Sequence, residues 1–455
     1  MSISELVNNQ KKAFREGITR SYSSRIKRLN LFRDLVSNHE GELCDAIRHD
    51  FGKPYFEAYS TEIFTLLEEI DTHLKNLSAW MKPDSVGGVI VTFPSKNRVY
   101  KQPLGTALII GAWNYPVQLA LLPVAGALSA GNTVVLKPSE MAPKTSNTIA
   151  KLVDKYFDPS VFSVVEGGVD ESTELLKQPF DKIFFTGSTR VGKIVMKAAA
   201  EQLIPVTLEL GGKSPAIVHH DANIEVSAKR IWWGKTINAG QTCVAPDFVA
   251  VHESQRESFI ETTKSTLSTF YSDDYRTGEN YTQIVNHDHF DRLKNLLDNT
   301  SVLHGGLNRK DTRFIEPTLI EAGWDDEIMQ EEIFGPLLPM ITYREPDELI
   351  EQLRSMSSPL ALYLFSDNKE FQNQIIENVP FGGGCINDTL THLANPRLPF
   401  GGVGNSGMGS YHGKRSFDTF SREQSVLKKP FWPDPDLRYP PYNEREISWF
   451  KKLFS

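Results

Sequence analysis

The sequence predicts an α/β protein with two doubly wound sheets of mainly parallel strands and a small β appendage. From residue 106 onward, short apolar runs fit for buried strands alternate with helical stretches. Before that point, residues 5–81 repeat apolar side chains every three or four positions, as amphipathic helices do. Hydrophobic residues make up 40% of the 455 residues and charged residues 23%, an ordinary globular balance that can bury a sizeable core.

The first 103 residues divide into a helical part and a β part. Residues 25–36 show the helical spacing of apolar side chains most plainly. At Gly87 and Gly88 the pattern changes, because an apolar run at 89–93 and a Pro-Ser-Lys-Asn turn follow. This change predicts a hairpin-like β excursion over residues 83–103.

The next hundred residues alternate between expected strands and helices. Residues 106–110 form an apolar run suited to a strand that is buried on both faces. Pro116 opens a helical stretch that stops at Gly131 and Asn132, which are typical helix-ending residues. Further strands are expected at 133–136, 161–165, 182–185 and 206–208. Helices fit between most of these strands, so the strands should run parallel.

A second αβ region begins after Gly212. Strands are expected at 216–218 and 247–252, and helices continue to about residue 394. The chain is rich in glycine beyond 398 and in proline and aromatic residues beyond 430. We therefore expect two αβ domains, with an appendage built from 83–103 and part of the C-terminal region.

Charge and composition exclude several classes of protein. There are 49 basic and 57 acidic residues, and a net charge of −8 gives no reason to expect a nucleic-acid partner. The first 20 residues are too polar for a signal peptide, and the most apolar stretch, 117–130, is shorter than the ~20 residues of a membrane span. The three cysteines form no CxxC pair, so neither a disulfide framework nor a thiolate zinc site is indicated. We expect a cytoplasmic protein without an integral membrane segment.

A glycine turn resembles a nucleoside-triphosphate loop in all but one position. Residues 187–193 (GSTRVGK) match the first seven positions of GxxxxGK[ST], between an expected strand and an expected helix at 191–202. The eighth position is Ile194, which has no hydroxyl to hold Mg²⁺, so the hydrolase interpretation fails there. Gly187 and Ser188 still precede a helix N-terminus, which suits a dinucleotide pyrophosphate as well as it suits an ordinary turn.

Cys243 is the candidate nucleophile. It lies among small and polar residues at 238–246, where a substrate could approach closely. Cysteine reacts as the thiolate, and a free thiol has a pKa of about 8.5, so a base or donor has to lie nearby. An isolated cysteine is more often a small buried hydrophobe, and this segment alone leaves both interpretations open.

Glu209 and Asn114 each follow an expected strand. Glu209 precedes two glycines at the end of the 206–208 strand, where α/β sheets place their active sites. A solvated acid in a turn is the alternative. The Asn114 amide could donate to a developing oxyanion or cap the helix that Pro116 opens, and the cap is favoured in isolation.

Together these segments resemble the aldehyde dehydrogenase superfamily. The matching motifs occur in the family's order: WNYP (113–116), KPSE (137–140), FTGS (185–188), ELGGK (209–213), GQTC (240–243) and EEIFGP (331–336). The short N-terminus, LPFGGVGNSGMG at 398–409 and the YHGK…SF that follows are similar to its class 3 branch. The resemblance implies an aldehyde dehydrogenase-like division of the chain. It gives an NAD(P)-binding domain (1–82 and 104–208), a catalytic domain (209–395), oligomerisation or bridging segments (83–103 and 396–430) and a tail (431–455).

The resemblance implies NAD(P)-dependent oxidation of aldehydes to carboxylic acids. Cys243 would attack the carbonyl carbon to form a thiohemiacetal, and the Asn114 amide and the Cys243 N–H would hold its oxyanion. An aldehyde has no leaving group, so the nucleophile first creates a centre from which hydride can depart. Glu209 would then activate the water that hydrolyses the resulting thioester, and it could also take the thiol proton. A CoA-acylating relative tends to lack such a base.

The resemblance also implies cofactor contacts. The residues are Lys137 and Glu140 at the adenosine ribose, Gly187 and Ser188 at the pyrophosphate turn, and Glu332 and Phe334 on the nicotinamide side. An acid at the ribose repels a 2′-phosphate, so Glu140 makes NAD the expected cofactor, with NADP as an alternative.

The resemblance further implies a homodimer whose interface is crossed by the 83–103 hairpin and C-terminal strands. Its substrates would be medium- or long-chain aliphatic, aromatic or apocarotenoid aldehydes. The tail at 444–455 is expected to dock on its own subunit or on the partner.

No metal site is expected, because the histidine pairs 219/220 and 287/289 lack a third ligand of suitable spacing. The remaining alternatives are a P-loop-like nucleotide hydrolase and a non-catalytic nucleotide-binding relative.

Overall fold

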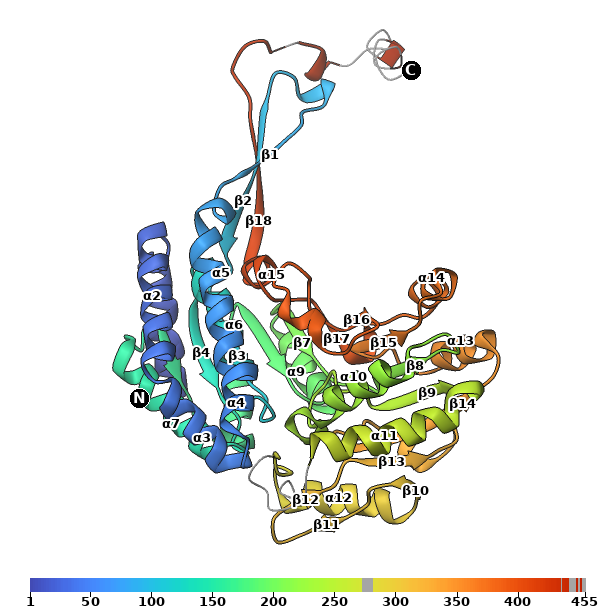
Figure 1. Ribbon diagram of the computed structural model, residues 1–455. Coiled ribbons are helices and arrows are strands. Elements are labelled where there is room, and N and C mark those ends of the chain that lie inside the picture. The colour runs from blue at the N-terminus through green and yellow to red at the C-terminus, as the bar shows by residue number, and fades with distance from the viewer. Residues whose placement is uncertain (272–280, 435, 442–446, 449–450, 452–455) are drawn as a thin grey trace.

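The computed structural model has two αβ lobes and a thin β arm that projects away from them (Figure 1). It describes residues 1–271, 281–434, 436–441, 447–448 and 451. The predicted amphipathic tail at 444–455 lies almost wholly outside the described residues. No helix in the described ranges is long and apolar enough to cross a membrane.

The N-terminal region is helical, as predicted. Its helices are α1 (Ile3–Arg15), α2 (Tyr22–Asn38), α3 (Glu40–Phe51), α4 (Tyr55–Ala58) and α5 (Phe64–Trp80), with one π-helical turn at Tyr59–Ile63. The first begins with a capping box, in which the Ser2 hydroxyl accepts from the Glu5 N–H and the Glu5 carboxylate accepts from the Ser2 N–H. The apolar faces of α2, α3 and α5 are buried on one side of the first lobe. Helix α1 instead packs its buried Val7 with Leu108 and Val135, whose side chains lie on the other face of the lobe's sheet.

A six-stranded sheet forms the centre of the first lobe. Its strands, in spatial order, are β17 (Gly407–Met408), β7 (Val206–Glu209), β6 (Lys182–Thr186), β3 (Thr106–Ile110), β4 (Thr133–Lys137) and β5 (Phe162–Val164). All neighbours are parallel except β17, which is antiparallel to β7. The helices between the strands are α6 (Gln118–Ala130), α7 (Pro143–Tyr156), α8 (Val169–Leu176) and α9 (Thr189–Glu201). The doubly wound sheet predicted from the apolar runs is confirmed.

The order of the strands places a topological switch point between β3 and β6. From β3 the chain moves outward to β4 and β5, then crosses back to β6 and β7 on the other side. The register sets Ile110 beside both Lys137 and Phe185, and Thr186 beside Glu209. The carboxyl ends of four adjacent strands therefore meet at one edge, where open α/β sheets bind their ligands.

A seven-stranded sheet forms the second lobe. Its order is β10 (Ser301–His304), β13 (Thr318–Glu321), β14 (Leu337–Tyr343), β9 (Phe248–His252), β8 (Pro215–Val218), β15 (Ala361–Phe365) and β16 (Gly383–Ile386). Only β10 is antiparallel to its neighbour among these strands. The remaining elements are α10 (Ile224–Thr236), α11 (Arg256–Phe270), α12 (His287–Asp298), α13 (Pro346–Ser355), α14 (Lys369–Asn378), α15 (Lys414–Thr419) and a short pair, β11 (Asn308–Arg309) and β12 (Phe314–Ile315).

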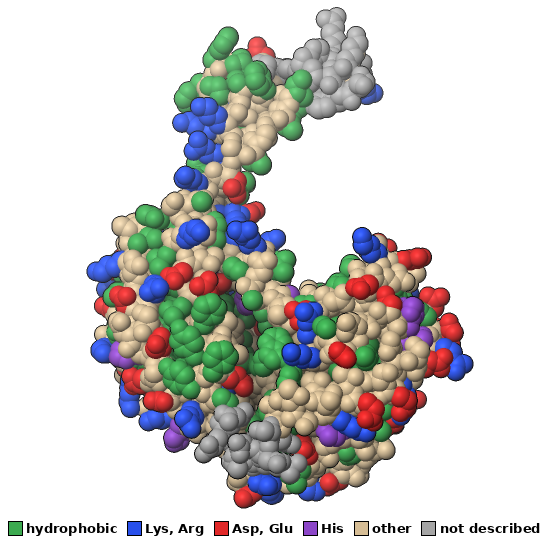
Figure 2. Space-filling model, in the orientation of Figure 1, with side chains coloured by type: hydrophobic (Ala, Val, Ile, Leu, Met, Phe, Trp, Pro, Cys, Tyr) green, Lys and Arg blue, Asp and Glu red, His purple; other side chains and the backbone are tan. Residues whose placement is uncertain are grey.

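The arm is a three-stranded antiparallel sheet. It contains β1 (Asp84–Val86), β2 (Lys96–Pro103) and β18 (Ser421–Lys428), with β2 in the middle. The β excursion predicted at 83–103 is thus present, and a C-terminal strand completes it. Hydrophobic side chains gather at the tip of the arm in Figure 2. The expected bridging segment 396–430 also supplies β17 to the first lobe, so it joins the arm to the sheet edge.

Candidate active site

A left-handed turn carries Cys243 out of α10. Asn238, Ala239 and Gly240 all have positive φ, at 53°, 52° and 72°. Asparagine and glycine tolerate this conformation, whereas alanine is strained in it. A side chain at Gly240 would place its Cβ 2.3 Å from the Gly335 carbonyl oxygen, so only glycine fits. The turn thus brings the Cys243 segment against the loop that precedes β14 and carries Gly335.

Gln241 fixes this turn from inside. Its side-chain nitrogen donates to the Asn238 carbonyl (3.0 Å) and to the Gln283 carbonyl (3.1 Å). Its side-chain oxygen accepts from the Val285 N–H at 2.9 Å. Gln241 is buried, and these bonds leave the loop little freedom to move. Cys243, two residues further on, is only half-buried.

Asn114 contacts the cysteine loop and does not cap α6. Its Nδ2 donates to the Gln241 carbonyl at 3.1 Å. The first amides of α6 are satisfied by Glu62 instead, whose Oε2 accepts from Val117 (2.8 Å) and from Gln118 (3.4 Å). The helix-cap interpretation favoured from sequence is therefore wrong, because a carboxylate 55 residues upstream takes that place.

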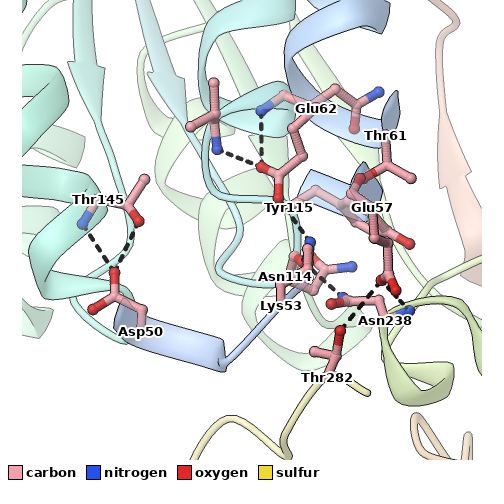
Figure 3. A network of polar contacts seen from close by, with 12 residues as sticks. Asp50, Lys53, Glu57, Thr61, Glu62, Asn114, Tyr115, Thr145, Asn238 and Thr282 are labelled. Carbon is pink, nitrogen blue, oxygen red and sulfur yellow. Dashed lines mark hydrogen bonds and ion pairs between the residues drawn. The ribbon is translucent and has the colours of Figure 1, made fainter. Parts of the chain in front are cut away.

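A buried polar network supports Asn114 and the loop from behind (Figure 3). The Lys53 Nζ lies 2.7 Å from the Glu62 Oε1, and both side chains are fully buried. On the loop side, Asn238 donates its N–H to the Glu57 Oε1 (2.7 Å) and its Nδ2 to the Asn114 carbonyl (2.8 Å). These bonds tie the end of β3, the N-terminal helices and the cysteine loop into one unit.

Glu209 stands at the end of β7 and is 2% exposed. Neither of its carboxylate oxygens has a hydrogen-bond partner among the described residues. Burial raises the pKa of this carboxyl well above its ordinary value of 4.5. A solvated acid, the alternative considered from sequence, is therefore wrong.

The Cys243 thiol shares this acidic environment. Burial raises its pKa, and the negative charges of Glu332 and Glu209 raise it further. Since a carboxylate influences this thiol only over a short range, Cys243, Glu209 and Glu332 belong to one site. The resting thiol is protonated, so a base must remove its proton before it can attack.

Glu332 and Phe334 reach this site from the second lobe. Burial, followed by the charge of Asp247, raises the pKa of Glu332 to about 8. A Cβ at Gly211 would lie 2.0 Å from the Glu332 carboxylate, so glycine permits this close approach. Phe334 has a φ of 52°, and its ring packs edge-on against Trp113 with centroids 5.4 Å apart.

The other predicted cofactor residues lie at the carboxyl edge of the six-stranded sheet. Lys137, at the end of β4, donates to the Glu140 carboxylate at 2.6 Å. Burial, the largest single influence, works to raise the pKa of Glu140. The Lys137 hydrogen bond, a backbone hydrogen bond and the Lys137 charge together outweigh it and lower the pKa. The Gly187 N–H donates to the Glu209 carbonyl (3.0 Å), and the Ser188 hydroxyl caps α9 by accepting from the Val191 N–H.

This edge fits a dinucleotide cofactor. The half-exposed Glu140 offers a charged acceptor for hydroxyl groups, and the N-terminus of α9 offers a positive dipole end. Thr186 Oγ1 is buried without a partner in the described ranges, as Glu209 is. A Cβ at Gly187 would lie 2.6 Å from the Phe185 ring, so any larger residue here would have to displace that ring.

Sequence and structure comparisons decide the family. Residues 1–426 match the Aldehyde dehydrogenase family. The chain belongs to this family. It is 46% identical over 439 residues to 4,4'-diaponeurosporen-aldehyde dehydrogenase of Staphylococcus aureus, covering 96% of this chain and 95% of that protein. It is 44% identical over 443 residues to the dimeric NADP-preferring aldehyde dehydrogenase of Rattus norvegicus, covering 97% and 98%.

The aldehyde dehydrogenase fold extends over the whole chain. A solved structure described as the substrate-bound state of Staphylococcus aureus AldH is similar at a TM-score of 0.98, with 44% identity and full coverage of both chains. The predictions of an α/β aldehyde dehydrogenase fold and of an NAD(P)-dependent enzyme that oxidises aldehydes are confirmed. The hydrolase and non-catalytic alternatives are not favoured.

Several residues of the site escaped the sequence analysis. Lys53, Glu57 and Glu62 gave no signal, because they lie about 180 residues before the cysteine loop that they support. The segment Asn238-Ala239-Gly240 did carry a signal, since asparagine and glycine are the residues that favour a left-handed turn. Lys235 was also missed; it is fully buried, and burial lowers its pKa to about 8.

Proposed function

We propose that Cys243 is the nucleophile, Glu209 the base and Asn114 the oxyanion donor of this aldehyde dehydrogenase. The observation that carries the proposal is Glu209, a buried carboxyl group with a raised pKa and no partner in the described chain. Structural acids in protein interiors are paired. An unpaired one beside a cysteine is available for proton transfer.

Cys243 Sγ bonds to the aldehyde carbon, and the carbonyl oxygen becomes an oxyanion. Asn114 Nδ2 carries two hydrogens, and the Gln241 carbonyl accepts one of them, so the other can point to the oxyanion. Because the polar network fixes the Asn114 backbone, this donor is held in place before substrate arrives. Such a donor is worth about 10²–10³ in kcat.

Glu209 handles two protons in succession. It accepts the thiol proton as the sulfur attacks and releases that proton to solvent. Once ionised again, it accepts a proton from the water that hydrolyses the thioester, and the departing Cys243 sulfur is reprotonated. Its raised pKa makes the ionised form a stronger base than an ordinary glutamate. A dinucleotide held by the residues named below would supply the acceptor for the hydride that leaves the carbon bonded to Cys243.

Six residues are proposed to hold the dinucleotide: Lys137, Glu140, Gly187, Ser188, Glu332 and Phe334. The ionised Glu140 favours a free ribose hydroxyl over a 2′-phosphate, which supports NAD as the preferred cofactor. The rat relative is named NADP-preferring, so NADP use is also proposed. The variant Glu140→Gln should raise the ratio of kcat/KM for NADP to that for NAD, and an unchanged ratio would contradict this role.

The test of the nucleophile is aldehyde-dependent reduction of NAD and NADP by Cys243→Ala. We expect turnover to fall by at least about 10³-fold, because no covalent adduct can form. The matched control is Cys385→Ala, which removes another half-buried thiol and should retain turnover. Turnover that survives in Cys243→Ala would mean that the nucleophile is misassigned.

Medium- and long-chain aliphatic, aromatic and apocarotenoid aldehydes are the proposed substrates. The Staphylococcus aureus relative is named 4,4'-diaponeurosporen-aldehyde dehydrogenase. Measuring kcat/KM for a series of straight-chain aldehydes and for benzaldehyde tests this class. A preference for two- or three-carbon aldehydes over all longer ones would contradict it.

A homodimer is proposed on the evidence of the arm. Phe93, Phe431 and Trp432 are all more than three-quarters exposed on it, although aromatic side chains of this size are normally covered. The rat relative is named dimeric. Light scattering should give twice the mass of 51.2 kDa, and a monomer at micromolar concentration would contradict the proposal.

A cytoplasmic location is also proposed, since all three cysteines are unpaired.

A further inference from the structure

A cluster of imidazoles and a carboxylate lies at the carboxyl end of β8 and β9. His219, His220 and Asp221 follow β8 directly, and each offers a ligand atom within 4.8 Å of the others. The pairing of Val218 with Val251 brings His252 alongside, with its ring centroid 5.8 Å from His219 and 5.5 Å from His220. The sequence analysis expected no metal here because it found no third ligand for the histidine pair.

Hydrogen bonds already orient the cluster. His219 Nδ1 lies 2.9 Å from the Tyr343 hydroxyl, which donates its own proton to the Val218 carbonyl at 3.5 Å. The Tyr343 oxygen can therefore accept from Nδ1–H and leave the lone pair of Nε2 available. Likewise, Ser254 Oγ lies 2.8 Å from His252 Nδ1. Histidines that bind metals are held by such second hydrogen bonds.

Asp221 is anchored in the same way. Its two oxygens accept from the Ser366 hydroxyl (2.8 Å) and from the Asp367 N–H (3.0 Å). Each oxygen keeps a second lone pair, so the carboxylate can still bind a cation. Because Ser366 follows β15, the ends of three neighbouring strands meet at this cluster.

The surroundings leave room for an ion beside the cluster. The cluster borders a cavity of about 520 Å³, which leaves room for an ion and water. His220 is exposed and can turn, which allows the ligand atoms to close to the ~2.0–2.2 Å bond lengths of zinc.

We propose that His219, His220 and Asp221, with His252 beside them, bind a divalent transition-metal ion. Imidazole nitrogen selects ions such as Zn²⁺, Ni²⁺ or Cu²⁺ over Mg²⁺ and Ca²⁺, which prefer oxygen ligands. Strand β9 runs from near Cys243 to His252, so the site lies at the other end of that strand from the nucleophile. The ion would tie the ends of β8 and β9 to the turn after β15.

The experiment is calorimetric titration of the full chain with ZnCl₂, in a Cys243→Ala background that removes the catalytic thiol as a competing ligand. We expect one Zn²⁺ per chain and a rise in melting temperature on binding. Both His220→Ala and Asp221→Asn should weaken binding at least tenfold. His49→Ala is the matched control, because His49 is exposed and distant in sequence, and it should leave the affinity unchanged.

Two results would overturn the proposal. One is the absence of a one-to-one binding event with Zn²⁺. The other is an affinity that stays within a factor of two in both His220→Ala and Asp221→Asn, since the ion would then be bound elsewhere. These outcomes are independent of the proposed catalytic roles, because the readout is binding and not turnover.

Discussion

Two buried glutamates, Glu62 and Glu209, differ in what surrounds them. Both Glu62 oxygens are bonded, one to Lys53 and the other to the first amides of α6. Neither Glu209 oxygen has a partner in the described chain. The first carboxylate fixes the position of the site, and the second supplies its reactivity. A buried acid that is fully paired stabilises a fold, whereas an unpaired one is kept for chemistry.

The largest expected effect is on stability, and it concerns Glu62, the glutamate whose oxygens are both bonded. Glu62→Gln leaves the buried Lys53 without an opposite charge, so we expect the free energy of unfolding to fall by about 3–5 kcal/mol. Denaturant unfolding measures it. Glu68→Gln, an exposed change on the adjoining helix α5, is the control and should stay within about 0.5 kcal/mol of wild type. Equal effects from the two variants would show that the pair does not hold the fold.

The next effect is on catalysis, at Asn114, whose backbone the Glu62 side of the comparison holds in place. Asn114→Ala removes the proposed oxyanion donor and should lower kcat by about 10²–10³-fold with a smaller change in KM. Steady-state kinetics measures both values. Asn295→Ala is an exposed control on α12 and should leave them unchanged. A loss confined to KM would place Asn114 in substrate binding alone.

The pH dependence of turnover should report the unpaired glutamate. Water activation needs the ionised carboxylate, and burial raises the pKa of Glu209 well above 4.5. Steady-state hydrolysis should therefore rise with pH through that raised pKa, at a pH higher than an ordinary glutamate would give. Glu209→Gln should abolish this acidic limb in the residual activity. If the acidic limb of the pH profile persists in Glu209→Gln, a titrating group other than Glu209 causes it.

The smallest expected effect is a gain in stability. Because the folded pKa of Glu209 is raised, its contribution to stability is fully present below the unfolded pKa and is lost as pH rises through the folded value. Glu209→Gln removes that loss, so it should be more stable than wild type by about 1 kcal/mol at pH 8 and show little gain at pH 4. Thermal unfolding at both pH values measures the difference. Destabilisation at pH 8 would show that Glu209 has a partner in the fold.

Much of this architecture could be predicted from local pattern. The apolar runs gave the central strands, and Gly131, with a φ of 92°, ends α6 where the helix-stop signal lies. Family motifs located Cys243 and Glu209. Contacts between residues far apart in the sequence could not be predicted. Asn114 does not cap α6 because Glu62 accepts from the first amides of that helix. Strand β17 joins a sheet whose other strands all lie before residue 210. His252 meets His219 only because β8 and β9 pair.

The most direct test of the central claim is a rapid-mixing experiment on Glu209→Gln with a long-chain aldehyde and NAD. If Glu209 activates the hydrolytic water, the variant should still reduce one equivalent of NAD per subunit in a burst and then almost stop. The burst should be slower than in wild type, because solvent must take the Cys243 proton in place of Glu209. Mass spectrometry should then find the acyl group on Cys243. Steady turnover at the wild-type rate, with no burst and no acylated Cys243, would contradict the account.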